Sequence, residues 1–186
     1  MKKIILLLFV LSTLILHQSV GACVGKTLYI GVVNSPNELL FAEMISVLVN
    51  ERTGTAVKVI SYKDAREMYS AVKKGEVGVL IENADRALKI LDRPAEGNTK
   101  AAYETAKKEY RTGMNLVWLE PFGGSQYYAP VLSIETIGSL PALPKVINKL
   151  AGMVNDETSA KLLRSMKPDE KPKKAARNFL KARKLI

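Results

Sequence analysis

Three strand-length apolar runs alternate with two helical segments over residues 28–81, and this alternation constrains the fold more than any other feature of the sequence. The runs are Leu28–Val33, Ala56–Ser61 and Val77–Ile81. Gly54 and Gly75 end the two helical segments between them. Short connections between alternating strands and helices favour right-handed crossovers. We therefore expect an α/β fold with a mainly parallel sheet flanked by helices.

Both helices in this region begin with recognisable capping signals. Ser35 can cap the first, with Pro36 at its first position and Glu38 completing a capping box. Asp64 and Glu67 have the spacing of a second capping box. Each helix is thus predicted to begin directly after the strand that precedes it.

A second strand pair follows, separated by a short turn. Leu116–Leu119 and Tyr127–Leu132 are strand-like, and Pro121, Gly123 and Gly124 break the chain between them. The other helices are expected over Asn83–Leu91, Lys100–Thr112 (ended by Gly113), Pro144–Met153, Asp156–Ser165 and Lys173–Lys184, with an irregular segment over Ile134–Leu143.

The first 22 residues have the layout of a secretory signal. Two lysines precede a thirteen-residue apolar run, Ile4–Leu16, which is too short to span a bilayer. Cys23, the only cysteine, follows Val20-Gly21-Ala22 in a pattern that resembles the lipobox of bacterial lipoproteins. We expect residues 1–22 to be a lipoprotein signal peptide and residues 23–186 to be one lipid-anchored domain; an ordinary secreted protein is the alternative.

This processing removes most catalytic chemistry from the mature chain. His17, the only histidine, lies within the predicted signal, and Cys23 would be blocked by lipidation. Ser-His-Asp and Cys-His nucleophiles and His/Cys zinc sites are therefore excluded. Glu82 and Glu120 both end strands and could form a carboxylate pair, but two solvated or capping glutamates explain them more simply. We predict no enzyme, no cofactor and no metal.

The positive charge is concentrated at the C-terminus. Residues 23–144 contain 14 basic and 14 acidic residues, whereas residues 145–186 contain 12 basic and 4 acidic ones. Phe179 is the single aromatic residue there, so basic and aromatic residues form no alternating pattern, and an exported protein does not routinely meet nucleic acid; we therefore expect no nucleic-acid partner. A solvated helical face, anionic lipid headgroups and an acidic partner remain the alternatives.

Several stretches resemble the periplasmic glycine betaine and osmoprotectant binding proteins of ABC importers. The resemblance is carried by Leu28–Leu39, Ala71–Val77, Asn115–Gly123, Leu140–Gly152 and Ala175–Leu185. Family members have two α/β lobes of the type II binding-protein fold that enclose a ligand between them. Here Gly123–Gln126 stands where a second lobe would be inserted. The resemblance implies a single lobe, which the basic helices over 144–186 complete.

The family holds quaternary ammonium groups in an aromatic cage, because a methylated cation is easily desolvated against π faces. Carried onto this sequence, the resemblance gives candidate ligand-binding residues Asn34, Ser35, Tyr62, Glu82 and Tyr127. Ser35 stands where an aromatic residue is common in the family, and Asn83 replaces a tyrosine. Tyr128 could add aromatic surface, and Trp118 is expected in the core.

Two functional hypotheses follow from these expectations. The first is a lipid-anchored, non-enzymatic solute-binding component of an ABC transport system for glycine betaine or a related quaternary ammonium osmolyte. The second is an envelope interaction or scaffold module that has lost ligand binding and transport. The expected partners are a small quaternary ammonium ligand, an ABC permease or other envelope protein, and the membrane through the lipid anchor. A homodimer through the cleft face is left open.

Overall fold

The computed structural model describes residues 27–165 and 172–186, so the predicted signal peptide and Cys23 lie outside the described residues. The order of elements is β1 (Leu28–Val33), α2 (Pro36–Thr53), β2 (Val57–Tyr62), α3 (Ala65–Lys73), β3 (Val79–Glu82), α4 (Ala84–Ile90), α5 (Thr99–Met114), β4 (Leu116–Trp118), β5 (Ala129–Ser133), α6 (Ile134–Ser139), α7 (Leu143–Ile147), the 3₁₀ turn Asn148–Leu150, α8 (Asp156–Ser165) and α9 (Pro172–Ala182).

Five described strands form one sheet in the order β2-β1-β3-β5-β4. β1 runs parallel to β2 and β3, as the alternation of strands and helices predicts. β5 is antiparallel to both β3 and β4, so the sheet as a whole is mixed. The reason is the short connection: residues 119–128 join β4 to β5, whereas a parallel crossover needs a dozen or more residues.

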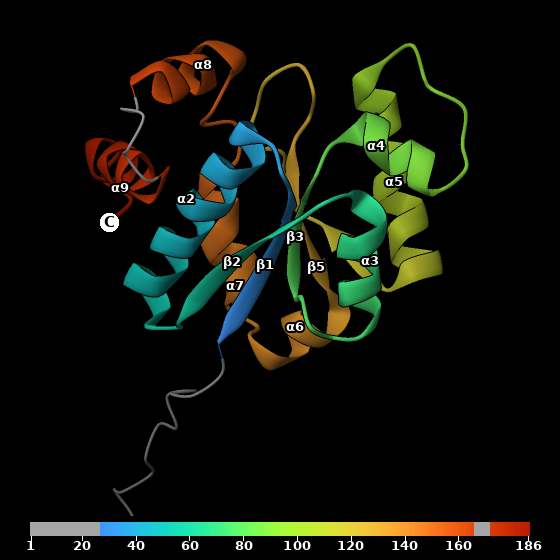
Figure 1. Cartoon of the computed structure of the whole chain (residues 1–186), viewed down its shortest axis with the longest axis horizontal. Helices are drawn as coiled ribbons and strands as arrows, with labels where there is room; N and C mark the ends of the chain where they lie inside the picture. Colours follow the sequence, from blue (N-terminus) through green and yellow to red (C-terminus); the bar gives the residue numbers. More distant parts are fainter. Residues whose placement is uncertain (1–26, 166–171) are drawn as a thin grey trace, which may run out of the picture.

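Helices cover both faces of the sheet, which gives three layers (Figure 1). One face carries α2, α7 and α9, and its core contains α2 side chains such as Leu40 and Met44 together with Phe179 and Leu180 from α9. The other face carries α3, α4 and α5 around Trp118. No described helix is long and apolar enough to cross a membrane.

Most predicted elements are present close to their expected bounds. Gly54 adopts φ 71° and ends α2, where a left-handed residue favours glycine. Ser35 occupies the N-cap position of α2 and Pro36 its first turn, as expected, but the predicted capping box was wrong: Ser35 makes no side-chain cap bond, and Glu38 accepts the Val33 N–H at 2.9 Å. Asp64 does cap α3, its Oδ1 accepting the Glu67 N–H at 2.9 Å.

Three further expectations were wrong for local reasons. Gly113 does not end α5, which continues to Met114 and ends at Asn115 with φ 56°. The segment expected to be irregular begins with helix α6, because Ser133 Oγ caps it by accepting the Thr136 N–H at 3.1 Å. The predicted helix over Pro144–Met153 is shorter, ending as a 3₁₀ turn.

The segment 119–128 is held firmly against residues 148–156. Gly152 N–H donates to the Pro121 carbonyl at 3.0 Å, and Val154 N–H donates to the Phe122 carbonyl at 2.9 Å. Ser125 N–H donates to an Asp156 carboxylate oxygen at 2.9 Å. The position at which a second lobe would be inserted is therefore a closed, hydrogen-bonded edge.

Candidate functional site

The carboxyl ends of β1 and β3 and the segment 119–128 gather at one edge of the sheet, which we call the ligand edge (Figure 1). Binding sites in open α/β sheets lie at the carboxyl ends of parallel strands. All five predicted ligand-binding residues lie at this edge or beside it: Asn34, Ser35, Tyr62, Glu82 and Tyr127. Tyr62 ends β2, the outer strand parallel to β1, and is in register with Val33 at the end of β1.

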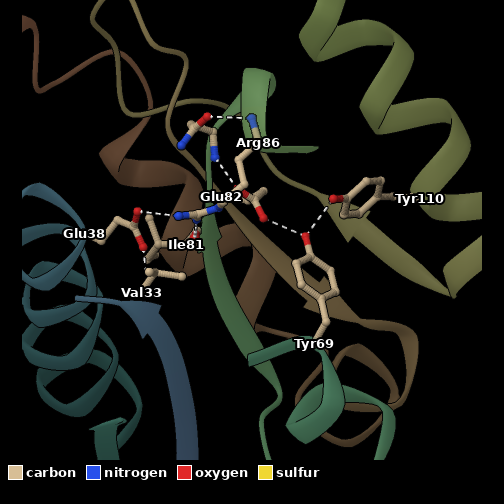
Figure 2. Close-up of polar contacts among 8 residues, drawn as sticks. Val33, Glu38, Tyr69, Ile81, Glu82, Arg86 and Tyr110 are labelled. Atoms are coloured by element: carbon tan, nitrogen blue, oxygen red, sulfur yellow. Dashed lines mark hydrogen bonds and ion pairs between the residues drawn. The ribbon is translucent and has the colours of Figure 1, made fainter. Parts of the chain in front are cut away.

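A buried ion network occupies the base of the ligand edge (Figure 2). Arg86, from α4, donates from Nη1 to Glu38 Oε1 at 2.7 Å and from Nε to Glu82 Oε1. Its Nη2 also donates to the Ile81 carbonyl at 2.8 Å. The Glu38 and Glu82 side chains are 2% and 0% exposed, and that of Arg86 is 19% exposed. One guanidinium thus bridges two carboxylates that solvent barely reaches.

Two buried tyrosines extend this network toward α5. Tyr69 OH donates to Glu82 Oε2 at 2.7 Å and lies 2.7 Å from Tyr110 OH (Figure 2). The Asn83 N–H donates to Glu82 Oε1 at 2.8 Å. Glu82 is therefore hydrogen-bonded on both oxygens, as a buried carboxylate must be to avoid a large desolvation penalty.

Burial and charge shift the pKa values of this network. Burial raises the pKa of Glu82, and this effect exceeds the lowering by Arg86, Tyr69 and the Asn83 N–H. Burial alone would lower the pKa of Arg86, but Glu82 and Glu38 outweigh it and raise that pKa. Burial also raises the pKa of Tyr69 well above its ordinary value, and Glu82 adds to this shift. The tyrosines therefore stay protonated and act as hydrogen-bond donors.

A second cluster at the ligand edge surrounds a pocket of about 320 Å³. It is lined by Glu120, Pro121, Gly123, Gly124, Tyr127, Ala151 and Gly152. Tyr127 adopts φ 47°, and its ring lies 5.9 Å from the ring of buried Tyr103. An aromatic ring beside a carboxylate is a combination that favours an organic cation.

Lys107 lies beside this pocket and partly neutralises the negative charge of Glu120. Its Nζ lies 5.2 Å from the centre of the Tyr103 ring and 3.2 Å from Glu120 Oε1. Burial alone would lower the pKa of Lys107, but Tyr103 and Glu120 outweigh it and raise that pKa. A cationic ligand at Glu120 would therefore share this carboxylate with Lys107.

The structure does not bring the five predicted residues into one pocket. Asn34 is exposed, and Ser35 is half-buried beside Tyr128, whose hydroxyl it contacts. Tyr62 is half-buried and packs over Gly31, where an added Cβ would lie 3.3 Å from its ring. Glu82 is enclosed, so it positions Arg86 and does not present a carboxylate at the surface. Among the five, Tyr127 alone lines the described pocket at this edge.

Sequence reasoning missed Glu38 and Arg86 as members of the network. Glu38 was assigned to a capping box, and Arg86 was given no role. One signal could have revealed the pair Glu82 and Arg86: they are four residues apart, at the spacing of a helical ion pair. The contact to Glu38 joins residues 48 positions apart and has no local signal.

Comparison with known proteins places the chain in a family. A sequence profile for the substrate-binding domain of the ABC-type glycine betaine transport system, OpuAC, matches residues 26–137. No curated protein sequence matches the chain.

Solved structures agree on the fold. The chain is similar to a glycine betaine/carnitine/choline ABC transporter protein, with 11% identity and a TM-score of 0.78 over 86% of this chain and 98% of that one. Apo YehZ from Escherichia coli is 11% identical, with a TM-score of 0.75 over 87% and 100% of the two chains. Lactococcal OpuAC, closed on glycine betaine, is 8% identical, with a TM-score of 0.52 over 86% and 97%.

These structural likenesses establish a binding-protein fold, here with one lobe-sized sheet. The profile establishes the family, since it spans more than half of the sequence. The chain belongs to the family of substrate-binding domains of ABC-type glycine betaine transport systems.

Proposed function

We propose that this protein is a lipid-anchored, non-enzymatic solute-binding component of an ABC import system, held at the cell envelope through Cys23. Its ligand is glycine betaine or a related quaternary ammonium osmolyte. The observation that carries the proposal is the pocket that Tyr127 and Glu120 both line. Glu120 lies within the stretch Asn115–Gly123, which resembles the family, and Tyr127 follows shortly after it. The permease of the import system is the expected protein partner.

The pocket offers two favourable contacts to a quaternary ammonium group. The Tyr127 ring supplies a π face, worth roughly 0.5–1 kcal/mol at an exposed site. Glu120, which is solvent-accessible, supplies a negative charge to a cation that cannot donate hydrogen bonds. Binding sites normally enclose 70–90% of a small ligand, and one lobe cannot do this. We therefore expect weak binding, with a Kd of about 1 mM or higher.

Calorimetric titration of residues 23–186 with glycine betaine, choline, carnitine and proline tests the proposal. Glu120→Gln should weaken binding of the quaternary ligands, and Tyr127→Asn, which tolerates the positive φ, should do the same. Glu104→Gln is the matched control, because Glu104 is an exposed glutamate of α5 outside the pocket. Absence of heat at tens of millimolar ligand, or an equal loss in the control, would contradict direct osmolyte binding.

A second candidate is an envelope interaction module, and the closed ligand edge favours it. The hydrogen bonds between segments 119–128 and 148–156 complete this edge without a ligand. In this second function, the ligand edge would contact another envelope protein or a second copy of the chain. Light scattering during size-exclusion chromatography tests pairing: a monomer at every concentration would contradict a homodimer.

A further inference from the structure

The outer helices α2 and α9 lie against one another (Figure 1). Arg177, in the middle of α9, is paired with Glu51 near the end of α2. Beyond them, Arg52 Nε donates to the Leu185 carbonyl at 2.7 Å. The last turn of α2 is therefore fixed against the residues that follow α9.

A pocket of about 330 Å³ with excess positive charge lies between these two helix ends. Its walls are Glu51, Arg52, Lys181, Lys184 and Ile186. Glu51 is paired with Arg177, and the other charged residues among those that line the pocket, Arg52, Lys181 and Lys184, are cationic. Residues 172–186 contain six basic residues and no acidic ones, so the surrounding surface is basic as well.

Lys184 occupies a backbone position that normally favours glycine. It follows α9 with φ 56°, and its N–H donates to the Lys181 carbonyl at 2.9 Å. The Leu185 N–H donates to the Leu180 carbonyl at 2.9 Å, which completes a helix-ending motif of the Schellman kind. A lysine in this conformation is less stable than a glycine would be.

The basic pocket lies at the edge of the sheet opposite the ligand edge. β1 begins there, since the Leu28 N–H donates to the Ala56 carbonyl at 2.8 Å just beyond the end of α2. Cys23 precedes Thr27 by four residues, a span of at most about 14 Å. A lipid anchor at Cys23 would therefore hold this edge, and the basic pocket with it, close to the membrane.

We propose that the basic pocket and the exposed face of α9 dock the lobe onto an anionic lipid surface, with headgroup phosphates between Arg52, Lys181 and Lys184. The ligand edge then faces away from the membrane. The orientation rests on the proposed anchor at Cys23, whereas the charge-dependent docking does not. Osmolyte binding and lipid docking are measured in separate experiments, so either proposal can be contradicted without the other.

Vesicle binding by residues 23–186 carrying Cys23→Ser tests the docking without an acyl chain; this segment contains both hydrophobic cores. We expect partitioning into phosphatidylcholine vesicles to rise with added phosphatidylglycerol and to fall with salt. Lys181→Gln with Lys184→Gln should lower partitioning about 25-fold at low salt, since each cation contributes roughly fivefold. The matched control is Lys89→Gln with Lys108→Gln, two exposed lysines of α4 and α5, and it should lower partitioning far less.

Lys184→Gly separates docking from folding. It should raise the thermal midpoint of unfolding while lowering vesicle partitioning about fivefold. Three results would overturn the proposal: no partitioning of the parent chain at low salt, an equal loss in the control pair, or a lysine-dependent site that binds only inorganic phosphate or single-stranded DNA.

Discussion

Replacing Arg86 by methionine should destabilise the fold strongly, because it leaves two carboxylates buried without a cation. Arg86 contacts Glu38, Glu82 and the Ile81 carbonyl, and both carboxylate side chains are at most 2% exposed. Removing one partner of a buried ion pair costs about 3–5 kcal/mol. A domain of this size is stable by only about 5–15 kcal/mol, so the loss would be a large share of the total.

The pH dependence of this variant provides a signature that a simple packing defect lacks. Burial already raises the pKa of Glu82 with Arg86 present, and without Arg86 that pKa should rise further. A carboxyl with a raised folded-state pKa favours folding below its unfolded pKa, about 4.3, and this contribution is lost as the pH rises through the folded value. Arg86→Met should therefore become less stable from pH 5 to pH 8, more steeply than the parent chain.

Urea unfolding followed by the fluorescence of Trp118, the single tryptophan, measures this effect at each pH. Arg93→Met is the control, because its ion pair with Glu109 is largely exposed and should contribute at most about 1 kcal/mol. Adding Glu82→Gln to Arg86→Met removes one buried charge and should recover part of the loss. A loss below about 1 kcal/mol at pH 7, or an unchanged pH slope, would refute the network as described.

Three further changes test other parts of the fold. Tyr69→Phe should cost about 1–3 kcal/mol in urea unfolding, because it removes the hydroxyl between Glu82 and Tyr110; a neutral effect would contradict that contact. Phe122→Ala should cost about 3–5 kcal/mol, since its ring is fully buried and stacks on another ring at 4.5 Å; a loss under about 1 kcal/mol would show that segment 119–128 is not packed as described. Gly124→Ala should lower the thermal midpoint, because φ is 81° and the added Cβ would meet an Asp156 oxygen at 2.5 Å; an unchanged midpoint would show that the closed edge is not rigid.

The first half of the fold could be predicted because its signals are local. The β1 run, the glycine that ends α2 and the Asp64 cap all act within a few residues of their own position. The directions of β4 and β5 depend on which strands pair across the sheet. In the sequence, only the short connection between β4 and β5 indicates that they are antiparallel. Helix α5 does not end at Gly113, because Asn115 and not Gly113 adopts the left-handed conformation that ends the helix.

The candidate site was harder to predict for a physical reason. Tyr127 was predicted through the family resemblance and lines the candidate pocket, whereas Glu38 and Arg86 meet only after folding brings α2 and α4 together. An isolated arginine or glutamate in a sequence is most often a solvated charge. Only the burial of both carboxylates identifies them as parts of a network.

The most direct test of the central claim, that the ligand edge retains an osmolyte site, is an amide chemical-shift titration of residues 23–186 with glycine betaine. The account predicts saturable shifts centred on Glu120, Gly123, Gly124, Tyr127 and Gly152, which line or border the pocket. Shifts of those amides should be smaller in Glu120→Gln at the same ligand concentration. No saturable shift, or shifts centred on the opposite edge around Tyr29 and Thr136, would contradict it.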